Sequence, residues 1–115
     1  RRSSDLEIYY FEAAVQRGAP TPTQSDPIGY FKGTSSDDRP YNLLAEVRSG
    51  DVALVPYGWH GPVMATPGYD LYFANIMAGP DPDRLWNITD DPCQSWIRDI
   101  WTTQEPDSRL PYTAI

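Results

Sequence analysis

The stretch Gly50–His60, GDVALVPYGWH, decides the fold because it joins a turn, a short apolar strand and a sharp corner. Residues 52–55 form an apolar run rich in β-branched side chains, which is typical of a buried strand. Pro56 ends the strand because it has no N–H to donate, and Gly58 lets the backbone bend sharply. The corner leads to His60, the only histidine of the chain. Rigid backbone there aims the imidazole as a metal ligand or acid–base group requires, although an ordinary half-buried histidine fits the same pattern.

Turn-forming residues recur along the rest of the chain, which contains 12 prolines and 8 glycines in 115 residues. Long helices do not survive this spacing, whereas short strands with tight turns do, so the sequence predicts an all-β fold. The expected strands are residues 6–13, 28–32, 41–48, 51–55 and 69–78. For residues 43–48 a helix is the alternative, because the alternation there is imperfect.

Two of the expected strands are apolar enough to suggest where they lie. Both faces of residues 6–13 are largely apolar, so we expect this strand to be covered on both sides. Residues 69–78 form the longest apolar and aromatic run, which predicts a central strand. Gly50 and Asp51 predict a hairpin-type entry into the strand that follows them.

One short helix is expected near the C-terminus. Residues 90–92, Asp-Asp-Pro, are typical of a helix start, because acidic side chains and proline both favour the first turn. Ile97, Ile100 and Trp101 then fall on one face at helical spacing. The pattern predicts a short amphipathic helix that docks on the sheet.

The charge and the cysteine count exclude several classes of function. A formal net charge of −7 argues against nucleic acids and anionic membranes as partners, because both need a basic surface. A single cysteine excludes an internal disulfide and fits a reducing cytoplasm. No apolar run approaches the roughly 20 residues that span a bilayer. The chain is long enough for one domain and does not begin with Met, so we expect it to be part of a longer protein.

A carboxylate in the first expected strand is a second candidate functional group. Glu7 shares a strand face with Tyr9 and Phe11, because side chains alternate between the two faces of a strand. Burying a carboxylate among aromatic rings is costly unless it is paired or bound to a metal.

Beyond these patterns, the chain resembles a known family. The pattern Gly-x5-Pro-x-Gly-x-His at residues 50–60 resembles the second half-motif of cupins, with one residue fewer before the histidine. A wider likeness is to the C-terminal half of the 5-deoxy-glucuronate isomerase family, and the sequence PGYDLY at residues 67–72 is its most specific part. The matching blocks, in one order along nearly the whole chain, are residues 6–10, 50–60, 67–79, 91–92, 96–97 and 109–111.

The resemblance implies a fold and a reaction. It implies a cupin-type, jelly-roll-like β-barrel from a bacterial, cytoplasmic enzyme of myo-inositol catabolism that is built from two cupin barrels. It implies an aldose–ketose isomerisation of a small sugar acid, 5-deoxy-glucuronate to 2-deoxy-5-keto-gluconate, through a metal-stabilised enediolate. Family members hold the metal with a His-x-His pair, a glutamate and a later histidine, and by motif position Glu7 and His60 match the last two. Zinc, manganese or iron would suit such ligands.

The chain departs from the family in one respect that matters for the site. It contains no His-x-His, which in the family lies shortly before the strand that matches residues 6–10. We therefore expect residues 1–115 to be a single C-terminal cupin domain, truncated on its N-terminal side, and to form homo-oligomers. The alternative to the isomerase is a non-catalytic cupin, a sugar-binding or oligomerisation module that has lost its metal.

Five further residues are weaker candidates, each with a structural explanation beside the functional one. Tyr9 and Tyr72 would bond sugar hydroxyls or move a proton, but tyrosines are more often core residues. Asp70 would act as the base, yet it also suits the turn beside it. Arg48 would bind the sugar-acid carboxylate and Asn75 would orient the substrate, although a solvated strand end and a structural clamp explain them as well.

Overall fold

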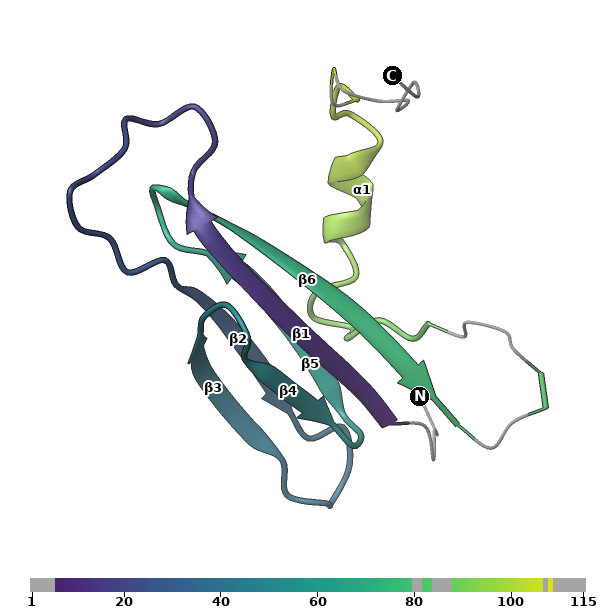
Figure 1. The fold of residues 1–115 in the computed structure, drawn as a ribbon. Coiled ribbons are helices and arrows are strands. Elements are labelled where there is room, and N and C mark those ends of the chain that lie inside the picture. The colour runs from purple at the N-terminus through teal and green to yellow at the C-terminus, as the bar shows by residue number, and fades with distance from the viewer. Residues whose placement is uncertain (1–5, 80–81, 84–87, 107, 109–115) are drawn as a thin grey trace.

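The computed structural model describes residues 6–79, 82–83, 88–106 and 108, and it contains six strands and one short helix (Figure 1). The matching residues 109–111 noted above lie outside this part. The elements are β1 (Leu6–Val15), β2 (Gly29–Thr34), β3 (Asn42–Val47), β4 (Val52–Val55), β5 (Trp59–Ala65), β6 (Tyr69–Ala78) and α1 (Ile97–Trp101). The predicted all-β, cupin-type fold with a short C-terminal helix is therefore confirmed. Residues 43–48 form most of a strand rather than the alternative helix.

The strands form two antiparallel sheets that face one another (Figure 1). In the first sheet β1 lies between β4 and β6, and in the second sheet β2 lies between β3 and β5. The prediction that residues 69–78 form a central strand is wrong, because β6 pairs only with β1 in the described part of the chain. Its apolar sequence reflects two apolar faces rather than two neighbouring strands.

The core lies between the two sheets and is mainly aromatic. Phe11 from β1 and Phe31 from β2 are fully buried, and their ring centroids are 5.8 Å apart. Tyr9, also on β1, lies 5.2 Å from Phe31 by the same measure. Val47, Ala53 and Val55 complete the buried cluster. The alternation of β1 sends Glu7, Tyr9 and Phe11 into this layer, as the sequence predicts.

The opposite face of β1 is not covered, contrary to the sequence-based expectation. Ile8 is only half-buried, and its neighbours across the sheet, Leu54 and Ile76, are exposed. In the next row Tyr10 lies between Val52 and Ala74. We call these six residues, Leu54, Ile8 and Ile76 with Val52, Tyr10 and Ala74, the outer apolar face of the first sheet. The apolar pattern on both sides of β1 therefore reflects one core face and one outer face.

The turn before β4 moves the chain from one sheet to the other. Gly50 has a φ of 90°, a conformation that glycine adopts readily. The N–H of Gly50 donates to the carbonyl of Phe11, and the N–H of Phe11 donates to the carbonyl of Asp51, each at 3.0 Å. The predicted hairpin is wrong, because β3 and β4 belong to different sheets. The turn instead attaches β4 to β1.

The corner after β4 forms as predicted and is tightly packed. β4 ends at Val55, directly before Pro56. Gly58 has a φ of 92°, and a methyl group on its Cα would overlap the carbonyl oxygen of Thr34. The hydroxyl of Tyr57 donates to the carbonyl of Pro40 at 2.7 Å, which ties the corner to the loop before β3.

A bulge in β5 sets the direction of the histidine. Phe31 pairs with Val63, whereas Gly33 pairs with His60, so two steps along β2 correspond to three along β5. The extra residue lies at Gly61-Pro62 and reverses the alternation of β5. His60 and Val63 consequently face the same side, the interior between the sheets.

The helix is shorter than predicted and does not dock on the sheet as a buried element. Turns occupy residues 92–96, α1 begins at Ile97, and none of its residues is buried. Ile97, Ile100 and Trp101 are each more than a third exposed. In the described part of the chain, no helix has the length and hydropathy that crossing a membrane would require.

Replacing Gly58 with alanine should destabilise the fold more than replacing any freely placed turn glycine. Gly58→Ala combines a left-handed backbone with overlap against Thr34, so we expect a loss of about 2–4 kcal/mol in the free energy of unfolding. Gly50→Ala is the matched control, because φ is equally positive there but a Cβ meets no atom within 4 Å. It should cost about 1–2 kcal/mol. Chemical denaturation measures both, and equal losses would contradict the packing argument.

Candidate functional site

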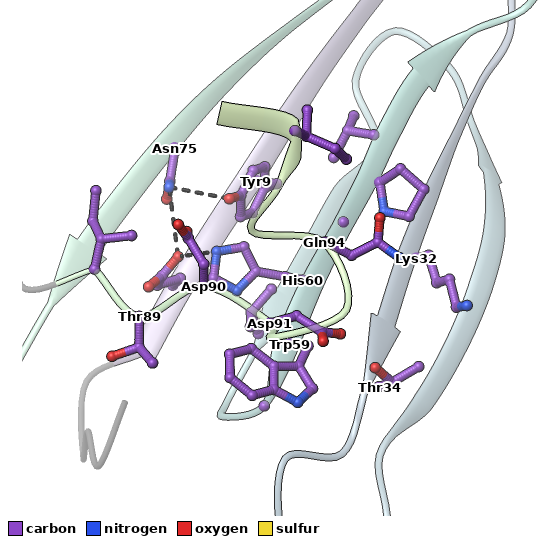
Figure 2. A pocket seen from close by; sticks show the side chains of 18 of the residues that line it. Tyr9, Lys32, Thr34, Trp59, His60, Asn75, Thr89, Asp90, Asp91 and Gln94 are labelled. Atoms are coloured by element: carbon purple, nitrogen blue, oxygen red, sulfur yellow. Dashed lines mark hydrogen bonds and ion pairs between the residues drawn. The ribbon is translucent and has the colours of Figure 1, made fainter. Parts of the chain in front are cut away.

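A cavity of about 530 Å³ opens beside the core, between the two sheets and the segment that carries α1 (Figure 2). Glu7 and Tyr9 of β1, His60 of β5 and Asn75 of β6 line it from the sheets. Residues 88–91 and several positions between 94 and 101 line it from the other side. The cavity therefore joins residues of five strands, β1, β2, β4, β5 and β6, with the segment that carries α1.

Two ionisable groups meet at the wall of this cavity. The Nε2 atom of His60 lies 3.1 Å from the Oε2 atom of Glu7. The Glu7 side chain is 7% exposed and that of His60 is 29% exposed, so the carboxylate is buried and the imidazole reaches solvent. Glu7 comes from the first sheet and His60 from the second. This non-covalent contact therefore connects the two sheets at the cavity wall.

Asn75 connects the carboxylate to a tyrosine. Its Nδ2 atom donates to the hydroxyl of Tyr9 at 3.2 Å and to Oε2 of Glu7 at 3.5 Å (Figure 2). β1 and β6 pair Tyr9 directly with Asn75, which places the two side chains on the same face. The Oδ1 atom of Asn75 is buried and has no hydrogen-bond partner in the described residues. The amide is thus oriented by its two acceptors.

Tyr9 occupies the centre of an aromatic group and keeps its proton. Its ring centroid lies 5.4 Å from that of Phe73 and 5.5 Å from that of His60. Burial, and secondly the charge of Glu7, raise the pKa of Tyr9 to about 12. Since the hydroxyl accepts a hydrogen bond from Asn75, its own hydrogen is available to a ligand in the cavity.

The structure brings four of the seven sequence-predicted site residues together: Glu7, Tyr9, His60 and Asn75. The other three lie away from the cavity. Asp70 accepts a hydrogen bond from the backbone of Arg17 at 2.9 Å, which fits the local role considered above. Tyr72 is 63% exposed. Arg48 forms an ion pair with Asp26 at 2.7 Å and a longer one with Glu46.

Several cavity residues were not identified from the sequence. Lys32, Trp59, Asp90 and Arg98 line the cavity, and Arg98 binds Asp90 through two hydrogen bonds. The order of the strands gave no reason to place residues 88–101 against His60. The one available signal was the spacing of Asp90, in the predicted helix start, and Arg98, eight residues further along the chain.

Glu7 and His60 belong to the residue types that bind divalent metals in proteins. A carboxylate oxygen and an imidazole nitrogen are ligands that zinc, manganese and iron accept, and here they converge on one point. A catalytic site usually has three protein ligands. Within residues 6–79, 82–83, 88–106 and 108, no group of three or more His, Cys, Asp or Glu side chains is placed to hold a metal. The described residues therefore bring together two side chains of the kind such a site uses, which is fewer than a complete site needs.

Comparison with known proteins gives a consistent family. A family model described as the KduI/IolB family matches residues 1–97. The chain is similar to proteins named 5-deoxy-glucuronate isomerase: 47% identical over 62 residues to that of Geobacillus thermodenitrificans, and 36% identical over 91 and 93 residues to those of Bacillus licheniformis and Lacticaseibacillus casei. These matches cover 54%, 79% and 81% of this chain. They cover 22%, 29% and 30% of the relatives, so the chain spans less than a third of their length. No solved structure gave a significant match.

The high pKa of Tyr9 should make the fold sensitive to alkali. Because the pKa is raised from 10.0 to about 12, the contribution of Tyr9 is complete below pH 10 and is lost as the pH rises toward 12. Tyr9→Phe should therefore show a smaller loss of stability between these two pH values than the unsubstituted chain. Denaturation at a series of pH values measures this, with the exposed Tyr72→Phe as control. Parallel profiles for all three proteins would contradict the prediction.

Glu7 and His60 should be energetically coupled. In metal-free buffer, Glu7→Gln, His60→Gln and the double variant form a cycle that isolates their interaction. Because Glu7 is buried and His60 is partly exposed, we expect a coupling of about 1–2 kcal/mol, below that of a fully buried pair. The exposed pair of Arg39 and Asp37 is the control, for which a smaller coupling is expected because solvent screens it. A Glu7–His60 coupling no larger than the control would contradict the assignment.

Proposed function

The chain belongs to the KduI/IolB family, and from this premise we propose that it forms part of the active site of a sugar-acid isomerase. The proposed reaction converts 5-deoxy-glucuronate to 2-deoxy-5-keto-gluconate, in keeping with the names of the relatives. The observation that supports it most is the 3.1 Å contact between Glu7 and His60 at the wall of a cavity large enough for a six-carbon sugar acid. In this proposal residues 1–115 are a C-terminal cupin domain of a longer cytoplasmic enzyme.

Glu7 and His60 are the proposed ligands of a divalent metal, zinc in the first place. Their donor atoms suit such an ion, and residues outside this chain would have to supply the others. When bound, the metal would act as a Lewis acid toward the carbonyl and hydroxyl oxygens of the sugar. In the metal-free chain the 3.1 Å contact pairs the same two groups, which offsets part of the cost of burying Glu7.

Tyr9 is the proposed proton donor to the substrate. An aldose–ketose isomerisation moves one proton between neighbouring carbons and a second from the hydroxyl oxygen to the carbonyl oxygen, so a group that gives a proton to the carbonyl oxygen regains one from the hydroxyl. The hydroxyl of Tyr9 remains protonated at neutral pH because its pKa is about 12, and it accepts a hydrogen bond from Asn75. Its hydrogen is therefore directed away from the amide and can be shared with a substrate oxygen in the cavity. Asn75 orients this hydroxyl.

The remaining walls position the substrate and limit its contact with water. Trp59 and Phe73 supply flat apolar surfaces, and Thr89 and Gln94 supply hydrogen-bonding groups (Figure 2). A largely apolar cavity with a few converging polar groups is typical of small-molecule sites. The outer apolar face of the first sheet also supports the expectation of a homo-oligomer, because such a surface is stabilised by being covered.

One observation favours the alternative function. The described residues provide only two metal ligands, so a sugar-binding cupin without metal would use the same cavity with Glu7 and His60 paired. The two functions differ in their demand for metal. The isomerase needs metal for turnover, whereas the binding module takes up sugar acid equally well in its absence.

The test uses the full polypeptide that carries these residues, loaded with zinc, manganese or ferrous iron and assayed for conversion of 5-deoxy-glucuronate. We expect Glu7→Gln and His60→Gln to lower kcat/KM at least about a hundredfold, since each removes a ligand. Tyr72→Phe, outside the cavity, is the control and should retain activity. In parallel, Mn²⁺ should broaden the proton resonances of His60, and should fail to do so in Glu7→Gln. Full activity in both ligand variants would refute the proposal, and metal-independent binding without turnover would establish the alternative.

A further inference from the structure

The cavity contains an arginine whose geometry suits a carboxylate. Of the cationic side chains that the structure describes, Lys32 and Arg98 line the cavity, whereas Arg17, Arg39 and Arg48 do not. A sugar acid carries one negative charge at neutral pH and would meet one of these two cations. The position that the sequence nominated, Arg48, is occupied by Asp26 and Glu46 outside the cavity.

Arg98 is held in place on one side only. Its Nε and Nη2 atoms donate to the two carboxylate oxygens of Asp90, the second at 2.8 Å. Its guanidinium carbon lies 5.4 Å from the ring centroid of Trp101, within cation–π distance. A guanidinium has five N–H groups, so this arrangement leaves the Nη1 hydrogens and one Nη2 hydrogen without a partner in the described residues.

These free hydrogens form the end of the guanidinium that binds a carboxylate with two parallel hydrogen bonds. Asp90 occupies the other side and therefore orients the group without blocking it. The side chain is 47% exposed, so a ligand in the cavity can reach it. Lys32 lacks comparable anchoring: no ion pair with another described residue fixes it, and Figure 2 shows it on the far side of the cavity from Asp90 and His60.

The geometry points to Arg98 as the residue that recognises the carboxylate of the sugar acid, with Asp90 as its positioning partner. This inference rests on the proposed function for the class of substrate. It assigns specificity for acids over neutral sugars to the segment that carries α1, opposite the proposed metal ligands. The substrate carboxylate would then bind Arg98 in the same cavity that Tyr9, Glu7 and His60 line.

The test compares two ligands of nearly the same shape, D-glucuronate and its neutral amide D-glucuronamide. Their dissociation constants are measured on the full polypeptide through tryptophan fluorescence, to which Trp101 beside Arg98 contributes. We expect the unsubstituted protein to prefer the acid by about 10-fold or more, as a charged hydrogen-bonded pair allows. Arg98→Gln should bring the two constants within about twofold and leave amide binding unchanged.

Arg39 provides a matched control. It binds Asp37 through the same Nε and Nη2 atoms and lies 3.9 Å from the ring centroid of Tyr57, but it does not line the cavity. Arg39→Gln therefore removes an equivalent exposed ion pair and should keep the preference for the acid. Arg98→Lys retains the charge without the paired donors, so an intermediate preference is expected. If Arg98→Gln does not fold, the acid preference measured for Arg98→Lys tests the role of Arg98 in its place.

The outcomes separate this inference from the proposed reaction. A preference that survives Arg98→Gln, disappears in Lys32→Gln, or is absent from the unsubstituted protein would overturn the role of Arg98. An acid preference that depends on Arg98, in a protein that shows no isomerase activity, would support the role of Arg98 and refute the proposed reaction alone.

Discussion

The structure depends on how a single buried carboxylate is compensated. Glu7 lies on the core face of β1, next to Tyr9 and close to Phe11, where an uncompensated charge would be strongly destabilising. His60 compensates it from the opposite sheet and Asn75 from the neighbouring strand. The buried carboxylate is thus also a group that joins the two sheets at the cavity. The pairing of the carboxylate therefore lies at the cavity, because the side chains that contact Glu7 also line that cavity.

Bringing His60 to that point requires two departures from regular structure. The left-handed Gly58 allows the chain to turn between the sheets at a place where any side chain would overlap Thr34. The bulge at Gly61-Pro62 then reverses the alternation of β5. In a regular strand, His60 and Val63 would lie on opposite faces. With Val63 packed on the core, the imidazole of His60 would then point away from Glu7. The direction of the His60 side chain therefore depends on these two irregularities and not on the regular alternation of a strand.

Most of the strands and half of the site could be predicted from the sequence, for identifiable reasons. Alternation in β1 placed Glu7 with Tyr9, and the proline and glycine of the corner located His60, because both signals act within a few residues. Strand order could not be predicted, since the apolar sequence of β6 does not distinguish a central strand from an edge strand with an apolar outer face. The cavity position of Arg98 could not be predicted either, because it depends on tertiary structure. Arg48, which is nearer to His60 in the sequence, forms an ion pair with Asp26 instead.

The two sides of the cavity differ in what they contribute to the fold. The side formed by the strands contains the buried core, whereas no residue of α1 is buried. Substitutions on the α1 side therefore have little effect on stability, while those at Glu7 or Tyr9 affect folding as well as chemistry. Under the proposed function, this asymmetry would allow a lineage to change which sugar acid it binds by altering the peripheral α1 segment while the strand residues at the cavity stay unchanged. Under that proposal, divergence of substrate range without divergence of fold is the expected pattern.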